Sequence, residues 1–145
     1  MNPPPAQGPA PVRVVVMPDL MAKGIVDASA SRVLEAWRGG RILLSVNRWM
    51  IVRYLRSFKQ LGVSAEVLRW WSWWLTSPAK ICHVDDEPLP LADPFQIAAE
   101  LARRTKATAV IHSGIDPDLN RLQATADVPW VSVSDFFQGA GKIPG

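Results

Sequence analysis

Met17, Pro18 and Asp19 are the first residues of this chain whose position could carry chemistry, because they follow a run of valines that is typical of a strand. Val12 and the segment Val14–Val16 predict a strand that is buried on both faces. Open α/β sheets bind their ligands at the carboxyl ends of the strands, so the residue type at this point largely decides the chemistry. Met17 carries a thioether there, which is a poor ligand for a hard cation.

The two histidines are further candidates for acid–base or metal chemistry. His112 ends another expected strand at the same edge of the sheet, where it could meet Asp19 or Asp116. His83 lies next to Cys82, the single cysteine of the chain. Neither histidine has the paired spacing of a zinc motif, so we interpret both as polar residues of a strand end or a loop.

Seven tryptophans are present, and four of them fall in one short segment: Trp70, Trp71, Trp73 and Trp74. On a helix, at about 100° per residue, these four spread over most of the circumference, so one core-facing stripe cannot bury them all. Some of them should therefore be exposed or lie in an interface, where tryptophan is enriched at hot spots. A wide aromatic core and stacking on unpaired bases are the alternatives.

A stripe of basic residues precedes the tryptophans: Arg48, Arg53, Arg56 and Lys59. No acid interrupts the sequence from Arg38 to Lys59, and the last three of the stripe are spaced to share roughly one helix face. Such a stripe could bind the phosphates of RNA, and it could equally be a solvated face. The formal charge of +3 and the pI near 9.4 are compatible with a polyanionic partner but do not require one.

Alternating strand and helix patterns supply the elements that would position these residues. We expect strands at 12–16, 42–45, 80–84, 109–112 and 130–133. We expect helices at 29–38, 47–60, 65–75 and 93–102. Ser29 or Ser31 is the expected cap of the first helix, and Ser64 that of the third. Such alternation predicts an α/β domain in three layers, with a central, mainly parallel sheet of four or five strands flanked by helices.

Composition and tails limit the remaining possibilities. A chain of 145 residues that is 48% hydrophobic and 20% charged suits a single globular domain. We expect a disordered proline-rich tail at 1–11, the domain at 12–138 and a flexible tail at 139–145. The first segment has neither the charge pattern nor the apolar core of a signal peptide, and no later stretch is long enough to span a membrane. A lone cysteine suits a reducing compartment, so we predict a cytoplasmic protein.

The order of these segments, from about Val12 to Phe137, resembles a PIN domain. The resemblance depends on the valine strand and its turn, SRVLEAWRGGRILLS, a helical pair, DPFQIAAELARRTKATAVIHSG and VPWVSVSDFF. More narrowly, the chain is similar to the branch described as toxin components of toxin–antitoxin pairs. The resemblance implies a PIN-like fold in which three or four carboxylates at the carboxyl edge of the sheet hold Mg²⁺ or Mn²⁺ and cleave a phosphodiester, usually of RNA.

Two of the acids that the resemblance implies are replaced in this chain. Met17 stands where the first acid would end the first strand, and Asp19 falls where an amide usually follows. Ile51 stands where the family has a glutamate in the helix after the second strand. A divalent ion held by oxygen ligands depends on the charge that these positions have lost.

The other two acids fall at uncertain registers. The third is either Asp93 or is replaced by Ala92, with Asp93 as its neighbour. The fourth is shifted at best, to Asp116 or Asp118, beyond Ile115. All three aspartates also suit a plainer role, since Asp93 precedes a proline at a helix start and the other two flank a proline in a turn.

We therefore expect a PIN-like domain that is catalytically impaired, needs no cofactor and acts as a binding or assembly module. Its expected partners are another protein chain, in a homo- or hetero-oligomer formed through the tryptophan-rich helix, RNA, or an antitoxin-like protein, and not a membrane. The alternative is an active Mg²⁺- or Mn²⁺-dependent endoribonuclease with Asp19, Asp93 and Asp116 as metal ligands and Asp118 as a further catalytic candidate. A different α/β module with the same strand order is the third interpretation.

Overall fold

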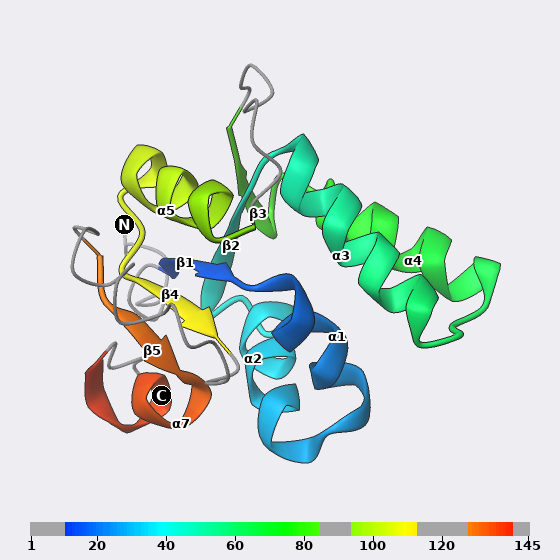
Figure 1. Ribbon diagram of the computed structural model, residues 1–145, viewed down its shortest axis with the longest axis horizontal. Helices are drawn as coiled ribbons and strands as arrows, with labels where there is room; N and C mark the ends of the chain where they lie inside the picture. The colour runs from blue at the N-terminus through cyan, green and yellow to red at the C-terminus, as the bar shows by residue number, and fades with distance from the viewer. Residues whose placement is uncertain (1–10, 85–93, 113–127, 141–145) are drawn as a thin grey trace, which may run out of the picture.

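Five strands pair in parallel at the centre of the molecule, in the order β3-β2-β1-β4-β5 (Figure 1). The computed structural model describes residues 11–84, 94–112 and 128–140. The strands are β1 (Val12–Val16), β2 (Ile42–Val46), β3 (Ile81–His83), β4 (Ala109–His112) and β5 (Trp130–Ser132). The predicted fold class, α/β with a mainly parallel sheet of four or five strands, is confirmed.

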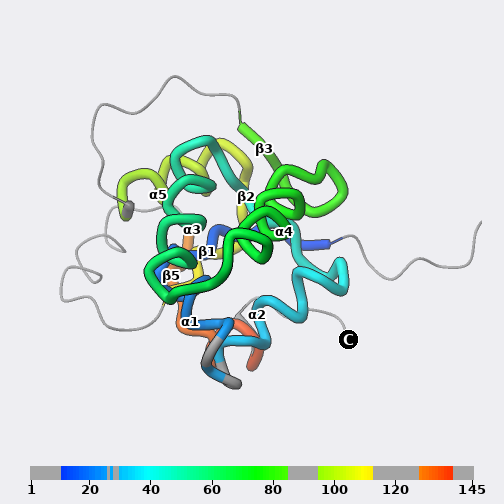
Figure 2. The backbone as a smooth tube through the Cα atoms, turned by 90° about the vertical axis from the view of Figure 1, so that its right-hand side faces the viewer, coloured from blue at the N-terminus to red at the C-terminus, as the bar shows by residue number. Residues whose placement is uncertain are grey.

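Helices cover both faces of this sheet and give the domain three layers. They are α1 (Pro18–Val26), α2 (Ala28–Arg38), α3 (Arg48–Gln60), α4 (Ala65–Leu75), α5 (Pro94–Thr105), α7 (Val133–Asp135) and η1 (Phe136–Ala140). α5 packs on β1, β2 and β4 from one side, while α1 and α2 lie on the other side (Figure 1 and Figure 2). α3 and α4 pack against each other and extend away from the sheet, and we call this pair the arm. Among the helices that the structure describes, none is long and apolar enough to cross a membrane.

The central strands are apolar because both of their faces are covered. Val14, Val15 and Val16 of β1 are fully buried, and so are Val110 and Ile111 of the neighbouring β4. A strand in the middle of a parallel sheet meets helices above and below, so it cannot alternate between apolar and polar residues. This is the reason that the valine run could be recognised from sequence.

Side chains at the helix starts account for most of the observed boundaries. Asn47 caps α3 by accepting a hydrogen bond from the Met50 backbone N–H (2.9 Å), and Ser64 caps α4 as predicted. For α2 the prediction of Ser29 or Ser31 was wrong, because Asp27 precedes the helix and its carboxylate accepts from the Ala30 N–H (3.5 Å). α1 was not predicted at all. Most of the two expected tails lies outside the described residues, although η1 reaches Ala140.

A buried tyrosine joins the arm to the sheet. The Tyr54 hydroxyl on α3 donates a hydrogen bond to the carbonyl of Val16, the last residue of β1, at 2.6 Å. The Tyr54 side chain is fully buried, and this burial raises the pKa of its hydroxyl far above the ordinary value. The hydroxyl therefore stays protonated and acts as a donor.

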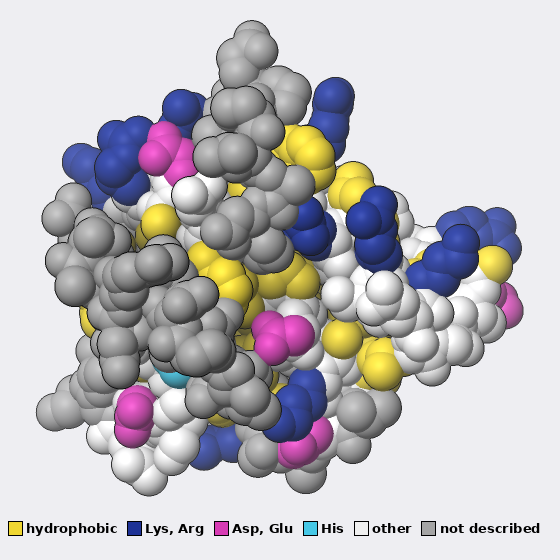
Figure 3. Space-filling model, viewed as in Figure 1, with side chains coloured by type: hydrophobic (Ala, Val, Ile, Leu, Met, Phe, Trp, Pro, Cys, Tyr) yellow, Lys and Arg dark blue, Asp and Glu magenta, His cyan; other side chains and the backbone are white. Residues whose placement is uncertain are grey.

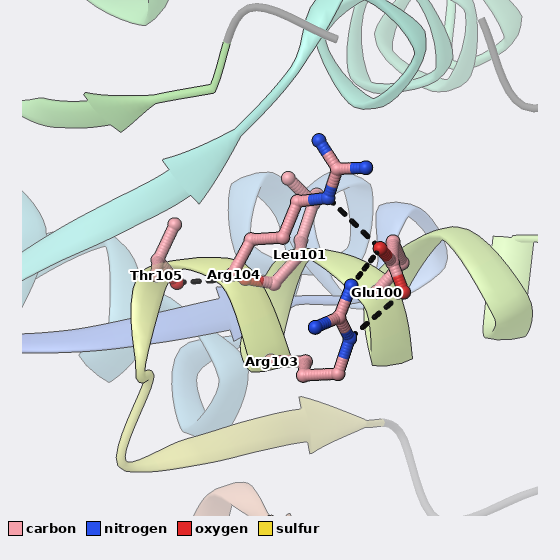
Figure 4. Close-up of polar contacts among 5 residues, drawn as sticks. All are labelled: Glu100, Leu101, Arg103, Arg104 and Thr105. Carbon is pink, nitrogen blue, oxygen red and sulfur yellow. Dashed lines mark hydrogen bonds and ion pairs between the residues drawn. The ribbon is translucent and has the colours of Figure 1, made fainter. Parts of the chain in front are cut away.

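A second buried polar contact fixes the end of α5 against β2. The Thr105 hydroxyl donates to the Leu101 carbonyl at 2.8 Å, as Figure 4 shows. The Ser45 hydroxyl lies 2.8 Å from the same Thr105 oxygen, and it must be the donor there because the Thr105 proton is already used. Arg13 of β1 donates to the Thr105 carbonyl at 2.8 Å, so three elements meet at this threonine.

The tyrosine contact leads to a prediction about stability. Tyr54→Phe keeps the ring but leaves the buried Val16 carbonyl without its donor, which should lower the free energy of unfolding by about 1–3 kcal/mol in urea denaturation. The matched control is Thr76→Val, which removes an exposed hydroxyl that donates to the Ser72 carbonyl (2.9 Å) and should change stability by less than about 0.5 kcal/mol. Equal effects of the two substitutions would contradict the role given to Tyr54.

Candidate functional site

The carboxyl ends of β1 and β4 lie side by side at the centre of the sheet. The Met17 N–H donates to the Ile111 carbonyl at 3.0 Å, which joins the two ends. In the sheet, β2 lies beside β1 on the side away from β4, and β5 lies beside β4 on the side away from β1. The chain therefore leaves β1 in one direction and β4 in the opposite direction. A parallel sheet opens a crevice where its connections diverge in this way, so this edge is the expected ligand site of the fold.

The centre of the edge is apolar. Met17 is only 3% exposed and belongs to the hydrophobic core, and Ile51 on α3 is half-buried against the same core. Neither side chain offers an oxygen ligand, so these two positions do not fit Mg²⁺ or Mn²⁺. Within residues 11–84, 94–112 and 128–140, no three His, Cys, Asp or Glu side chains are grouped closely enough to hold a metal ion.

Asp19 and Asp135 flank the buried histidine at this edge. Asp19 is an exposed residue of the first turn of α1, and Asp135 ends α7, just after β5. His112 is 9% exposed at the end of β4. Burial lowers the pKa of His112 below its ordinary value and outweighs the hydrogen bond with the Trp130 backbone and the two negative charges, all of which raise it.

A cavity of about 270 Å³ opens beside His112. Its apolar walls come from α1, α2 and the start of α7, and its polar lining is formed by Lys23, Arg32, His112, Ser132 and Ser134. The Ser132 hydroxyl is directed to α7, where it accepts a hydrogen bond from the Asp135 N–H (3.1 Å). Arg32 is also held, because its guanidinium lies 4.3 Å from the centre of the Phe137 ring.

Sequence reasoning did not single out Asp135, Lys23 or Arg32. Asp135 could have been found, because β5 is parallel to β4 and the residues after β5 must reach the same edge. Lys23 and Arg32 lie on α1 and α2, and the part of the chain that contains α1 carried no recognised helix pattern. Of the predicted acids, Asp19 lies at this edge, whereas Asp93, Asp116 and Asp118 lie outside the described residues.

No family model and no curated protein matches this chain. The resemblance to PIN domains therefore stays a prediction, and it still depends on the order and spacing of the elements.

The predicted basic stripe lies on the arm. Arg48, Arg56 and Lys59 of α3 are exposed, while Arg53 is half-buried. In the space-filling view, dark blue side chains follow the arm and alternate with yellow hydrophobic ones (Figure 3). Binding of RNA by these four residues stays a prediction.

The basic residues at the end of α5 are different, because two of them share one carboxylate. Arg103 and Arg104 both donate to the carboxylate of Glu100, at 3.2 Å and 2.8 Å for their Nε atoms (Figure 4). The contact with Arg103, followed by that with Arg104, lowers the pKa of the Glu100 carboxyl. Glu100 offsets one of the two positive charges, so this cluster retains less net positive charge than the α3 stripe.

The four tryptophans of α4 divide between the core and the surface, as the helix geometry predicted. Trp71 is 6% exposed and stacks on Trp37 of α2, with ring centres 5.8 Å apart and planes 13° from parallel. Trp74 is half-buried and meets Trp37 edge-on at 5.8 Å. Trp70 is 41% and Trp73 67% exposed. Trp71 and Trp74 thus connect the arm to α2, whereas Trp70 and Trp73 are accessible to a partner.

The environment of His112 predicts a pH dependence of stability. Because the folded state lowers the pKa of His112, the unfolded chain binds its proton more readily, and the free energy of unfolding should fall as pH drops below about 6.5 until the pH passes the folded pKa. His112→Gln should remove this slope in urea denaturation from about pH 8 to pH 5. His83→Gln, at an exposed site, is the control and should retain it. A slope that survives in His112→Gln would contradict the assignment.

The division of the tryptophans predicts unequal effects on stability. Trp71→Ala removes a buried indole and should lower the free energy of unfolding by about 3–5 kcal/mol. Trp73→Ala on the same helix should change it by less than about 0.5 kcal/mol, because that indole is largely in solvent. Chemical denaturation followed by circular dichroism measures both. A large loss for Trp73→Ala would mean that Trp73 belongs to the core.

Proposed function

We propose that this chain is a PIN-like domain, related to metal-dependent ribonuclease toxins, that is catalytically impaired and acts as a binding or assembly module. The observation that carries the proposal is the burial of Met17 at the end of β1, where the resemblance calls for an acid. A core thioether at that point gives a hard cation neither charge nor an oxygen ligand.

The packing around α3 supports the same conclusion. One turn after Ile51, the Tyr54 ring is buried against the end of β1 and its hydroxyl occupies the Val16 carbonyl. The space between α3 and the end of β1 is thus filled by apolar and aromatic groups at the place where the resemblance expects a glutamate. A carboxylate at the half-buried position of Ile51 would lose part of its hydration against the apolar core, which is unfavourable.

The arm supports the binding part of the proposal. Trp70 and Trp73 expose their indole rings to solvent, and burying such large apolar groups against a partner is favourable. Exposed tryptophans of this kind are typical of interface hot spots. Oligomerisation through α4, contact with an antitoxin-like protein, and contact of the α3 stripe with RNA are the modes of binding that belong to this proposal. A cytoplasmic location belongs to it as well.

One observation favours the alternative, an active endoribonuclease dependent on Mg²⁺ or Mn²⁺. The negative charges of Asp19 and Asp135 both raise the pKa of His112, so two carboxylates lie near this histidine. In that alternative Asp93 and Asp116 would complete the set with Asp19. The two proposals differ in whether the chain binds Mn²⁺ and cleaves RNA.

The test is Mn²⁺ titration by calorimetry together with cleavage of a mixed-sequence RNA. We expect no cleavage that depends on Mn²⁺, and no difference in Mn²⁺ binding between the chain and Asp19→Asn or Asp93→Asn. Glu66→Gln, which removes an exposed carboxylate in the first turn of α4, outside the lining of the cavity beside His112, is the control for unspecific loss of charge. Cleavage that requires Mn²⁺ and disappears in Asp19→Asn or Asp93→Asn, but not in the control, would establish the alternative.

A further inference from the structure

A groove of about 450 Å³ runs between the two helices of the arm. Leu55 of α3 and Leu68 of α4, both half-buried, give it an apolar floor. Its rim consists of Arg56, Lys59 and Arg69, which are all exposed, and of Ser72. The groove is separate from the carboxyl edge of the sheet, since the two share no lining residue.

The rim has a strong excess of positive charge. α3 and α4 together carry five basic residues and one acid, Glu66, whereas the whole chain has a net charge of only +3. Within the part of the chain that the structure describes, the ion pairs involve other residues, so no carboxylate neutralises Arg56, Lys59 or Arg69. The groove thus combines an apolar floor with cations that remain available to an acidic ligand.

The arm also exposes apolar side chains outside the lining of the groove. Trp73, one helical turn after Arg69, is 67% exposed. Leu61, which follows α3, is 43% exposed, and Val67 is 40% exposed. These side chains and the two leucines favour a ligand with apolar groups of its own, because phosphates alone would use only the rim.

A second copy of this chain is a poor occupant for the groove, since two arms would bring like charges together. A helix that lies in a groove between two helices buries apolar side chains at three- and four-residue spacing, and its flanks meet the rim. We propose that the groove binds an acidic amphipathic helix of a protein partner, whose leucine-type side chains contact Leu55 and Leu68 and whose carboxylates pair with Arg56, Lys59 and Arg69. This inference rests on the proposed binding function and names the chemistry of the partner.

The probe is a fluorescent synthetic peptide of about 20 residues, long enough to form a helix on binding, with leucine at helical spacing and glutamate on both flanks. We expect saturable binding by fluorescence anisotropy, and a loss of affinity of about tenfold or more in Arg56→Glu/Arg69→Glu, where repulsion replaces attraction. The matched control, Arg41→Glu/Lys106→Glu, makes the same change of charge at exposed residues outside the arm and should retain most of the affinity. Circular dichroism establishes that both variants are folded.

Two further probes separate this proposal from its competitors. A peptide with the same glutamates but serine in place of leucine should bind about tenfold more weakly or worse, because it offers nothing to the apolar floor. Equal binding of the two peptides, no binding of either, or tighter binding of a single-stranded RNA that is lost in Arg56→Glu/Arg69→Glu, would each overturn the proposal. Dimerisation of the chain that depends on these two arginines, measured by sedimentation equilibrium, would overturn it as well.

The result is distinguishable from the outcome for the proposed function. Binding of the acidic peptide together with Mn²⁺-dependent RNA cleavage would show that the domain is an active nuclease that still uses the groove. If the chain neither binds the peptide nor cleaves RNA, the proposal of a catalytically impaired domain stands and only the groove proposal fails.

Discussion

The structure depends on how the end of β1 satisfies its backbone hydrogen bonds. β1 lies between β2 and β4, and its last groups have no access to water. The Val16 carbonyl therefore accepts from the Tyr54 hydroxyl, and the Met17 N–H donates to the Ile111 carbonyl. Buried backbone groups must be paired in this way, because an unpaired one is costly. These two bonds orient α3 and join β1 to β4 at the edge where a parallel sheet usually binds its ligand, and the centre of that edge, at Met17, is apolar.

The same constraint places the polar chemistry of the edge at its margins. Asp19 lies in α1, just after β1, Asp135 ends α7, just after β5, and His112 is the last residue of β4. Met17, which follows β1 directly, belongs to the core. A charge at the position of Met17 would need a partner or a metal to offset its desolvation. The arm has the opposite character, because its cations face solvent and its apolar groups are only partly covered. The exposed cations and apolar groups of the arm thus belong to residues other than those that line the cavity beside His112.

Much of the fold could be predicted because the relevant signals are local. The valine run of β1 and the capping serine of α4 each specify their element with adjacent residues. α1 was missed because Pro18, Gly24 and the nearby Asp27 suggest a turn, whereas in the structure Pro18 starts the helix, Asp27 both ends α1 and caps α2, and Gly24 lies against Leu34. A Cβ on Gly24 would stand 3.0 Å from the Leu34 side chain, a contact between two helices that no sequence pattern shows.

The candidate sites were predicted less completely, because they depend on contacts between distant segments. Helix geometry predicted that some of the four tryptophans would be exposed, but not that Trp71 is the buried one, whose stacking partner is Trp37 on another helix. The basic stripe was visible in sequence, whereas the leucine floor between α3 and α4 required the packing of the two helices. Asp135 can be recognised as a site residue only from the parallel pairing of β4 and β5, which places it near His112.

The attachment of α4 has a consequence for motion. Trp71 and Leu75 are its buried residues, and its remaining surface is exposed or half-covered. Proteins open locally where few apolar contacts hold an element, and such openings need not involve the whole fold. We therefore expect α4 to exchange its amide hydrogens through a local detachment that leaves the sheet intact and that must break the contacts of Trp37 with Trp71 and Trp74 and of Phe58 with Trp71. Any ligand that bridges α3 and α4 would suppress that opening. Binding at the arm would therefore slow the hydrogen exchange of α4 without requiring a change in the conformation of the helix.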